Sequence, residues 1–413
     1  MNQPFYEQIR VFDPVPGQTK KGNIYLEATN SGAVIAFGTT LPTARLPGGA
    51  DHGFPWMHLR ARSIDSGRSW SLDEMNWWEP EKRGLLASVV DRSTGEIFMF
   101  TQGTWPLQDD HGKPLSESWL IANYEKGRQM GACLTLERSV DDGRTWTSTD
   151  ISEQFYTYPG AGLAWFIGSG IQLQRGSHRG RLVVPGRYFT GNWQEVDPSE
   201  HNIIYYHPAL GDVYDDGIGE IAQVLDHEAH NMVIYSDDHG ETWHWGGNSQ
   251  GHCGEACIVE LSDGSIYMNN RNHDPRSMGH RSWCISRDGG ESFTEFGVDR
   301  TLIENRCHAA LMRYSFPNDN EPGCVLFSNP AVHEGKSQLH PRGGKAGQRR
   351  DLTVRVSHDD CKTWSISRRV SEQAGYSSLA VLEDGTILCA YDAYVCRFNL
   401  AWLELDQSGS API

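Results

Sequence analysis

Short runs of β-branched and aromatic residues dominate the chain, and most of them are bounded by Gly, Asp or Asn. Such runs are typical of β-strands that end in tight turns. No long segment repeats its apolar residues with the 3.6-residue period of an amphipathic helix, so we expect helices to be few and short. Strands are predicted at residues 24–26, 33–37, 96–100, 180–185, 232–236, 266–269, 325–327, 352–357 and 386–391.

One turn motif, Ser-x-Asp-x-Gly-x-Ser/Thr-aromatic, occurs five times. In each copy we expect the Ser and Asp side chains to hydrogen-bond turn amides, the Gly to adopt a positive φ and the aromatic ring to pack beneath the turn. The last copy has Cys361 in the glycine position. Five copies in one chain indicate a repeat architecture. They occupy residues 63–70, 139–146, 236–243, 286–293 and 357–364.

The spacing of these copies predicts an all-β fold, a six-bladed β-propeller. Each interval between copies has room for one four-stranded blade and its loops, which gives five marked blades and one unmarked blade. The longest interval, between Asp141 and Asp238, is expected to hold the unmarked blade. Residues 192–230 within it are polar and without a strong pattern, so we interpret them as a loop insertion.

Ring closure sets a further requirement on the two ends of the chain. A strand near residues 5–12 could pair in the last blade with residues 395–405, and this pairing would protect edges that otherwise associate with other chains. No linker separates the copies of the motif, so we expect residues 1–413 to form a single domain.

The overall charge and hydropathy exclude some partners. A formal net charge of −17 argues against nucleic acid, although a local cluster of arginines could still bind a small acidic molecule. No apolar stretch approaches the 18 residues of a membrane span, so we expect no membrane insertion. The N-terminus lacks the basic and apolar regions of a signal peptide, which favours a cytoplasmic enzyme.

Cysteine and histidine spacing does not favour metal binding. The nine cysteines contain no CxxC pair, and most lie in apolar, strand-like runs, so reduced core thiols are expected. The segment from His227 to His230 lacks the HExxH spacing of zinc proteases. We therefore predict no metal and no cofactor.

Three segments resemble the sialidase (neuraminidase) family, whose propellers carry the turn motif as the BNR repeat or Asp-box. Residues 255–271 resemble its signature, in which an acid begins the run and an arginine ends it on a strand facing the central cavity. Residues 349–357 resemble the segment that carries another arginine, and residues 375–380 resemble the one with the catalytic tyrosine. Residues 168–173 and 306–311 match further family strands, so the resemblance extends in order from about residue 30 to 395.

The resemblance implies a role for each matching residue. Arg271 and Arg349 would bind the carboxylate of a sugar acid through charge-assisted bonds, with the neighbouring Arg350 as an alternative to Arg349. Tyr376 would be the nucleophile and Glu255 its base, because a neutral nucleophile avoids repulsion from the substrate's carboxylate.

The general acid of the family precedes the first Asp-box. Asp51, in the stretch Gly-Ala-Asp-His-Gly-Phe, lies at that position, which implies that it protonates the leaving group.

The chain departs from the family near its N-terminus. Gly22-Asn23-Ile24 aligns with an Arg-Ile-Pro motif that supplies the first arginine of a three-arginine clamp, and the family's Glu-Gly-Arg after the next strand is also absent. We expect another cation to substitute, either Arg45 or Arg60. Lys21 is a further candidate. A pocket modified for a different sugar acid and a loss of hydrolysis are the alternatives.

Together these features favour an exo-acting, retaining glycosidase. It would release terminal sialic acid, or a related 2-keto sugar acid such as deaminated sialic acid (Kdn) or Kdo, from a glycan through a tyrosyl intermediate. A non-catalytic glycan-binding propeller and a propeller polysaccharide lyase are the alternatives.

Overall fold

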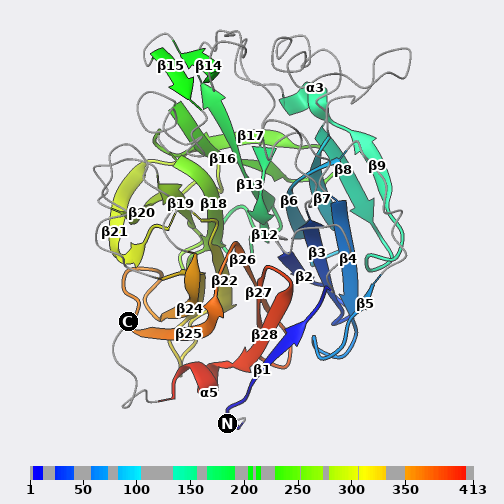
Figure 1. Cartoon of the computed structure of the whole chain (residues 1–413), viewed down its shortest axis with the longest axis vertical. Coiled ribbons are helices and arrows are strands. Elements are labelled where there is room, and N and C mark those ends of the chain that lie inside the picture. The colour runs from blue at the N-terminus through cyan, green and yellow to red at the C-terminus, as the bar shows by residue number, and fades with distance from the viewer. Residues whose placement is uncertain are drawn as a thin grey trace.

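The computed structural model describes residues 3–12, 24–40, 57–72, 82–103, 134–155, 165–190, 203–207, 211–214, 228–251, 253–272, 279–305, 307–331 and 349–405. Within these ranges the chain forms six sheets of four or five strands and one separate hairpin (Figure 1). Neighbouring strands pair antiparallel, except that β11 runs parallel to β6. Each sheet is one blade, so the prediction of an all-β, six-bladed propeller is confirmed.

The first three blades follow one another in chain order, and each is described from its innermost paired strand outward. A single helical turn, α3 (Ser152–Phe155), follows blade 2. Blade 1 contains β2 (Ile24–Ala28), β3 (Val34–Thr40), β4 (Met57–Ser63) and β5 (Ser71–Leu72); blade 2 contains β11 (Gly168–Ser169), β6 (Lys82–Val90), β7 (Ile97–Gly103), β8 (Leu134–Ser139) and β9 (Thr147–Asp150); and blade 3 contains β10 (Trp165–Phe166), β12 (Ile171–Gln172), β13 (Leu182–Thr190), β16 (Glu228–Ser236) and β17 (His244–Asn248).

The remaining three blades have four strands each. Blade 4 contains β18 (Cys253–Glu260), β19 (Ile266–Asn272), β20 (His280–Ser286) and β21 (Glu295–Ile303); blade 5 contains β22 (Ala310–Ser315), β23 (Cys324–Pro330), β24 (Arg350–Ser357) and β25 (Ile366–Gln373); and blade 6 contains β26 (Ser377–Val381), β27 (Thr386–Tyr391), β28 (Tyr394–Asn399) and β1 (Tyr6–Arg10). The strands β2, β6, β13, β18, β22 and β26 contact one another in a closed ring, which is the centre of the propeller.

The core lies between the blades, and each of six apolar clusters joins two neighbouring blades. Strand β18 shows the cause, because its successive side chains point to opposite faces. Ala256 and Ile258 pack against blade 3, whereas Cys257 and Val259 pack against blade 5. Inner strands are therefore apolar on both faces, which explains their continuous hydrophobic runs.

Blade 6 closes the ring from both ends of the chain. Strand β1 pairs with β28 with Tyr6 opposite Phe398, and Figure 1 shows the blue strand beside the red one. The buried Arg397 on β28 forms an ion pair with Glu7 on β1. Strand β28 ends before the predicted 395–405 segment does, because Asn399 accepts a hydrogen bond of 3.0 Å from the amide of Trp402 and begins the helical turn α5 (Leu400–Leu403).

The unmarked blade is blade 6, so its expected position between Asp141 and Asp238 is wrong. Each Asp-box joins the last two strands of its blade. In blade 6 these strands are β28 and β1, which no turn can join because they come from opposite chain ends. The interval between Asp141 and Asp238 holds blade 3 instead. Residues 192–230 also contain the hairpin β14 (Ile203–His207) and β15 (Gly211–Tyr214), in place of a simple loop insertion.

The Asp-box has the predicted geometry, which the second copy illustrates. The hydroxyl of Ser139 accepts a 2.8 Å hydrogen bond from the amide of Gly143, and Asp141 accepts one of 2.8 Å from the amide of Thr145. Trp146 donates to the carbonyl of Gly143 at 3.0 Å, which holds the ring beneath the turn. Hydrogen bonds from the hydroxyl and amide of Thr145 lower the pKa of Asp141 to about 2.

The fifth Asp-box keeps the turn without its glycine. Cys361 adopts the left-handed conformation with a φ of 66° and buries its side chain in the cluster between blades 4 and 5. Trp364 donates to the carboxylate of Asp299 at 2.8 Å, where the second copy uses a turn carbonyl. The cysteines within the described ranges are all buried and free.

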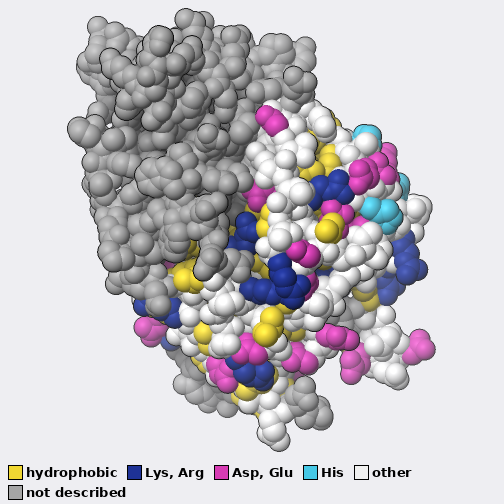
Figure 2. Space-filling model, turned by 90° about the vertical axis from the view of Figure 1, so that its right-hand side faces the viewer, with side chains coloured by type: hydrophobic (Ala, Val, Ile, Leu, Met, Phe, Trp, Pro, Cys, Tyr) yellow, Lys and Arg dark blue, Asp and Glu magenta, His cyan; other side chains and the backbone are white. Residues whose placement is uncertain are grey.

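The surface mixes charges of both signs. Figure 2 shows one face of the molecule on which basic and acidic side chains lie next to each other and hydrophobic ones are scattered. Among the helices that the structure describes, none is long and apolar enough to cross a membrane.

Gly32 and Gly240 have nearly the same backbone conformation, so substituting each of them distinguishes the cost of backbone strain from the cost of a steric clash. Gly240 in the third Asp-box has a φ of 82°, and a Cβ there would lie 2.3 Å from the ring of Phe98 in blade 2. Gly32 has a φ of 83° but nothing within 4 Å of its Cβ position. We expect Gly32→Ala to lower the free energy of unfolding by about 1 kcal/mol, and Gly240→Ala to lower it by about 2 kcal/mol more. Chemical denaturation measures both, and equal losses would contradict the packing argument.

Candidate active site

Four side chains predicted from the sequence meet at one end of the inner ring. Tyr376, directly before β26, donates a short hydrogen bond to Oε1 of Glu255 on β18. Nη1 of Arg271 on β19 lies 2.9 Å from Oε2 of Glu255 and 3.1 Å from the hydroxyl of Tyr376. Arg349, directly before β24, places its guanidinium carbon 5.2 Å from the centre of the Tyr376 ring. Blades 4, 5 and 6 thus each supply part of one cluster.

Local irregularities of the backbone aim two of these residues. The pairing of β18 with β19 shifts register between Cys253 and Ala256, so Glu255 lies in a β-bulge. Bulges re-aim side chains and are common beside active sites. Gly375 precedes Tyr376, and a Cβ there would lie 2.5 Å from the carboxylate of Asp392. A larger residue would displace the segment that presents the tyrosine.

Burial gives the Glu255–Tyr376 pair its chemical character. Glu255 is 3% exposed, and burial raises the pKa of its carboxyl, while the positive charge of Arg187 and the hydrogen bond from Tyr376 oppose this increase. Burial, followed by the negative charge of Glu255, raises the pKa of Tyr376. The tyrosine is therefore neutral at rest, beside a carboxylate that can accept its proton. A carboxylate of raised pKa is a stronger base.

Arg187 belongs to this cluster, and the sequence did not indicate it. It lies on β13, where it shares a face with Val183, and Val183 packs against Ala256 of β18. Arg187 thus faces blade 4 and is 8% exposed, and its positive charge opposes the increase in the pKa of Glu255. The available signal was an arginine two residues beyond the predicted strand 180–185, on its alternating pattern.

His308 lies beside Tyr376. Its ring centre lies 5.7 Å from that of Tyr376, and its Nε2 is 3.3 Å from the carbonyl oxygen of Ala256. Burial, assisted by the charge of Arg281, lowers the pKa of His308 to about 3. The imidazole is therefore neutral and adds no charge to the site.

Comparison with known proteins identifies the family. The family model described as BNR repeat-like domain matches residues 60–389. The chain is 30% identical to a sialidase of Micromonospora viridifaciens over 380 residues, which cover 86% of this chain and 48% of that protein. The chain belongs to the sialidase superfamily. It spans about half the length of the curated relatives that it matches first, 48% and 55% respectively.

Solved sialidase structures share the propeller. The Hadza microbial sialidase Hz136 superposes with a TM-score of 0.64 at 24% identity, over 92% of this chain and 65% of that chain. An intramolecular trans-sialidase from Ruminococcus gnavus superposes with a TM-score of 0.61 at 17% identity, over 93% and 95% of the two chains. These likenesses concern the fold.

The sialidase-family residues expected near the N-terminus have mixed outcomes. Asp51 and Arg45 lie outside the described residues and stay predictions. Arg60 lies on β4, where it faces blade 2, with its guanidinium carbon 4.6 Å from the Trp146 ring and a nitrogen 3.9 Å from Glu137. Those contacts place it between blades, and the structure does not bring it to the Glu255–Tyr376 pair.

The alternative of Arg350 to Arg349 also has a structural answer. The guanidinium of Arg350 lies 3.9 Å from the carboxylate of Asp351 and is half exposed, whereas that of Arg349 lies over the Tyr376 ring. The alternation of the strand sends the two arginines to opposite sides. Geometry therefore favours Arg349 for the site.

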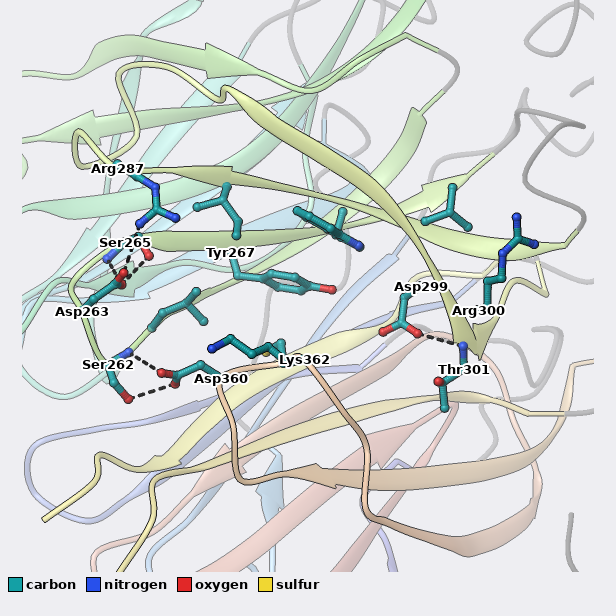
Figure 3. Close-up of a pocket in the computed structure, with 15 residues that line it drawn as sticks. Ser262, Asp263, Ser265, Tyr267, Arg287, Asp299, Arg300, Thr301, Asp360 and Lys362 are labelled. Carbon is teal, nitrogen blue, oxygen red and sulfur yellow. Dashed lines mark hydrogen bonds and ion pairs between the residues drawn. The ribbon is translucent and has the colours of Figure 1, made fainter. Parts of the chain in front are cut away.

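A separate cavity of about 910 Å³ lies between blades 4 and 5 (Figure 3). Its acids serve local structure: Asp263 bonds Ser265 and Arg287, and Asp360 bonds Ser262. Its aromatic lining residues, Tyr267 and Trp283, belong to the apolar cluster between the two blades or pack against it. None of the predicted site residues that the structure describes lines it. No group of three metal-ligating side chains occurs within the described ranges.

The buried ion pair of the site can be tested without a substrate. Arg271→Met leaves the Glu255 carboxylate buried without its closest cation, and we expect the free energy of unfolding to fall by about 3–5 kcal/mol. Adding Glu255→Gln removes the unpaired charge, so the double variant should lose less than the sum of the two single variants. Denaturation at neutral pH measures the cycle. Arg287→Met, which removes the exposed ion pairs with Asp263 and Glu295, is the control and should lose little stability. Additive losses would refute direct coupling.

Proposed function

We propose that this protein is an exo-acting, retaining sialidase-like glycoside hydrolase, acting on glycans that end in sialic acid or a related 2-keto sugar acid. The observation that carries the proposal is the hydrogen bond from Tyr376 to Glu255, with Arg271 bonded to both side chains. A neutral nucleophile with a buried base suits a substrate whose anomeric carbon carries a carboxylate.

Charge at the site supports an acidic substrate. Three arginines lie around the Glu255–Tyr376 pair, although the chain as a whole has a formal net charge of −17. They are Arg187, Arg271 and Arg349. Buried cations attract an anion more strongly than surface cations, because the surroundings screen them less. Arg271 and Arg349 would bind the substrate carboxylate with the planar, charge-assisted geometry that guanidinium groups provide.

The first chemical step forms a covalent intermediate. The Tyr376 oxygen attacks the anomeric carbon while its proton passes to Glu255, and the bond from that carbon to the aglycone oxygen breaks. Asp51 protonates the departing oxygen. The new bond joins the tyrosine oxygen to the anomeric carbon, on the face opposite the leaving group.

The second step releases the sugar acid with its original anomeric configuration. Asp51, now ionised, takes a proton from a water molecule, whose oxygen attacks the anomeric carbon. The bond to Tyr376 breaks, and Glu255 returns the proton to the phenol oxygen. Arg271, within hydrogen-bonding distance of that oxygen, stabilises the phenolate as it leaves.

Tyrosine substitution tests the mechanism directly. Tyr376→Phe should lower kcat/KM toward an aryl sialoside by about a thousandfold or more, because the nucleophile is lost. Tyr267→Phe, at a buried tyrosine between blades 4 and 5, is the matched control and should leave the rate unchanged. A Tyr376→Phe variant with normal turnover would rule out the tyrosyl intermediate. Binding of sialoglycans without release of free sugar acid by the native protein would instead indicate a glycan-binding propeller.

Asp51→Ala provides a second variant in the same assay. Its rate should fall more on sialyllactose than on an aryl sialoside with a good leaving group, since only the poor leaving group needs protonation. Equal losses on both substrates would remove Asp51 from that role.

The charge of Arg187 predicts a shift in the pH profile. Replacing it by Gln removes a positive charge that stabilises the Glu255 carboxylate, so the pKa of Glu255 rises further. A base with a higher pKa is ionised only at higher pH, and the acidic limb of kcat/KM should therefore move to higher pH. Arg138→Gln, at ion pairs with Glu96 and Glu241, is the control and should leave the limb in place. A limb that does not move, or moves to lower pH, would contradict the placement of Arg187.

A further inference from the structure

Tyr25 on β2 is a fully buried tyrosine at the centre of the propeller. Its ring belongs to the apolar cluster between blades 1 and 2, against which Tyr376 also packs. The ring centre lies 5.8 Å from that of His308, in an edge-to-face arrangement with an interplanar angle of 71°. His308 in turn lies beside Tyr376, so all three rings surround one point of the site.

The hydroxyl of Tyr25 is buried and has no hydrogen-bond partner among the described residues. Burial, together with the negative charges that its neighbours Tyr376 and Glu255 carry when ionised, raises the pKa of Tyr25 well above its ordinary value. The phenol is therefore neutral, and its proton is available for donation. A buried donor without a partner is costly, so such a group in a native protein calls for an explanation.

The position of Tyr25 on its strand suggests that explanation. Strand β2 contains no basic residue, and the segment 13–23 before it contains no arginine, although it contains Lys20 and Lys21. The ring of inner strands places β2 in contact with β26, which begins directly after Tyr376. Strand β4 of blade 1 carries two arginines, and both contact blade 2: Arg60 lies beside Glu137 and Trp146, and Arg62 pairs with Asp142. The Tyr25 hydroxyl lies on the blade 1 side of the site, where β2 itself supplies no cation.

We propose that the Tyr25 hydroxyl binds the carboxylate of the sugar acid, together with Arg271 and Arg349. This assignment rests on the proposed function. The bound carboxylate would supply the acceptor that the hydroxyl lacks in the free protein. A neutral donor binds an anion more weakly than a guanidinium does. The site would therefore hold the carboxylate through two charged donors, Arg271 and Arg349, and one neutral donor, Tyr25. The neutral donor favours a ligand whose acceptor atom lies in the correct position, in addition to one that carries a negative charge.

Tyr25→Phe should weaken ligand binding without lowering the stability of the free protein. The variant should bind 2,3-dehydro-2-deoxy-N-acetylneuraminic acid about 10-fold or more weakly by calorimetry, because a hydrogen bond to a charged group is lost. It should lose less affinity for the 1-carboxamide of that ligand, which is uncharged. The thermal midpoint of the free protein should stay the same or rise, since the substitution removes a buried donor without a partner.

The outcomes separate this inference from the proposed function. Tyr267→Phe is the control and should change neither binding nor the effect of the carboxamide. Unchanged affinity of Tyr25→Phe for the acid, or equal losses for acid and carboxamide, would overturn the inference while native binding and turnover still support a sialidase. A lower thermal midpoint with parallel losses for both ligands would indicate a structural role and would also overturn it. A native protein that binds neither ligand and releases no sugar acid would overturn both.

Discussion

The pairing of β1 with β28 keeps the ring of inner strands closed, and the candidate site depends on that closure. Glu255 comes from blade 4, Tyr376 from the entry to blade 6 and Tyr25 from blade 1, so no single blade contains the site. Contacts between blades are apolar clusters, which resist sliding because their side chains interlock. The short distances within the site therefore follow from the packing of the whole ring.

Closure of the ring also buries the side chains of the candidate site, and this burial changes their pKa values. A carboxylate as buried as Glu255 would be costly alone, and it is held by Arg271, by the Tyr376 hydroxyl and by the charge of Arg187. The same burial raises the proton affinity of the carboxylate and keeps the tyrosine neutral. Burial of this cluster of opposite charges thus accounts both for how its side chains are held and for their expected reactivity.

The sequence predicted those features that are encoded locally. Each Asp-box is a self-contained turn, so the propeller followed from its copies, and Glu255, Arg271, Arg349 and Tyr376 lie in segments with recognisable residue order. The prediction placed the blade without an Asp-box in the longest interval between motifs. That was wrong, because the length of an interval in residues does not show how many strands it contains. Arg187 was missed because its role arises only when β13 lies beside β18. No local pattern records that neighbour.

The origin of blade 6 from both chain ends has a consequence for biosynthesis. Its fourth strand, β1, is translated before its partner β28, with almost the entire propeller between them. The N-terminal strand therefore has no partner strand while almost the entire propeller is translated. Because the pair is so distant in sequence, we expect its pairing to form late in folding. The candidate site, which depends on the closed ring, would be complete only after that pairing.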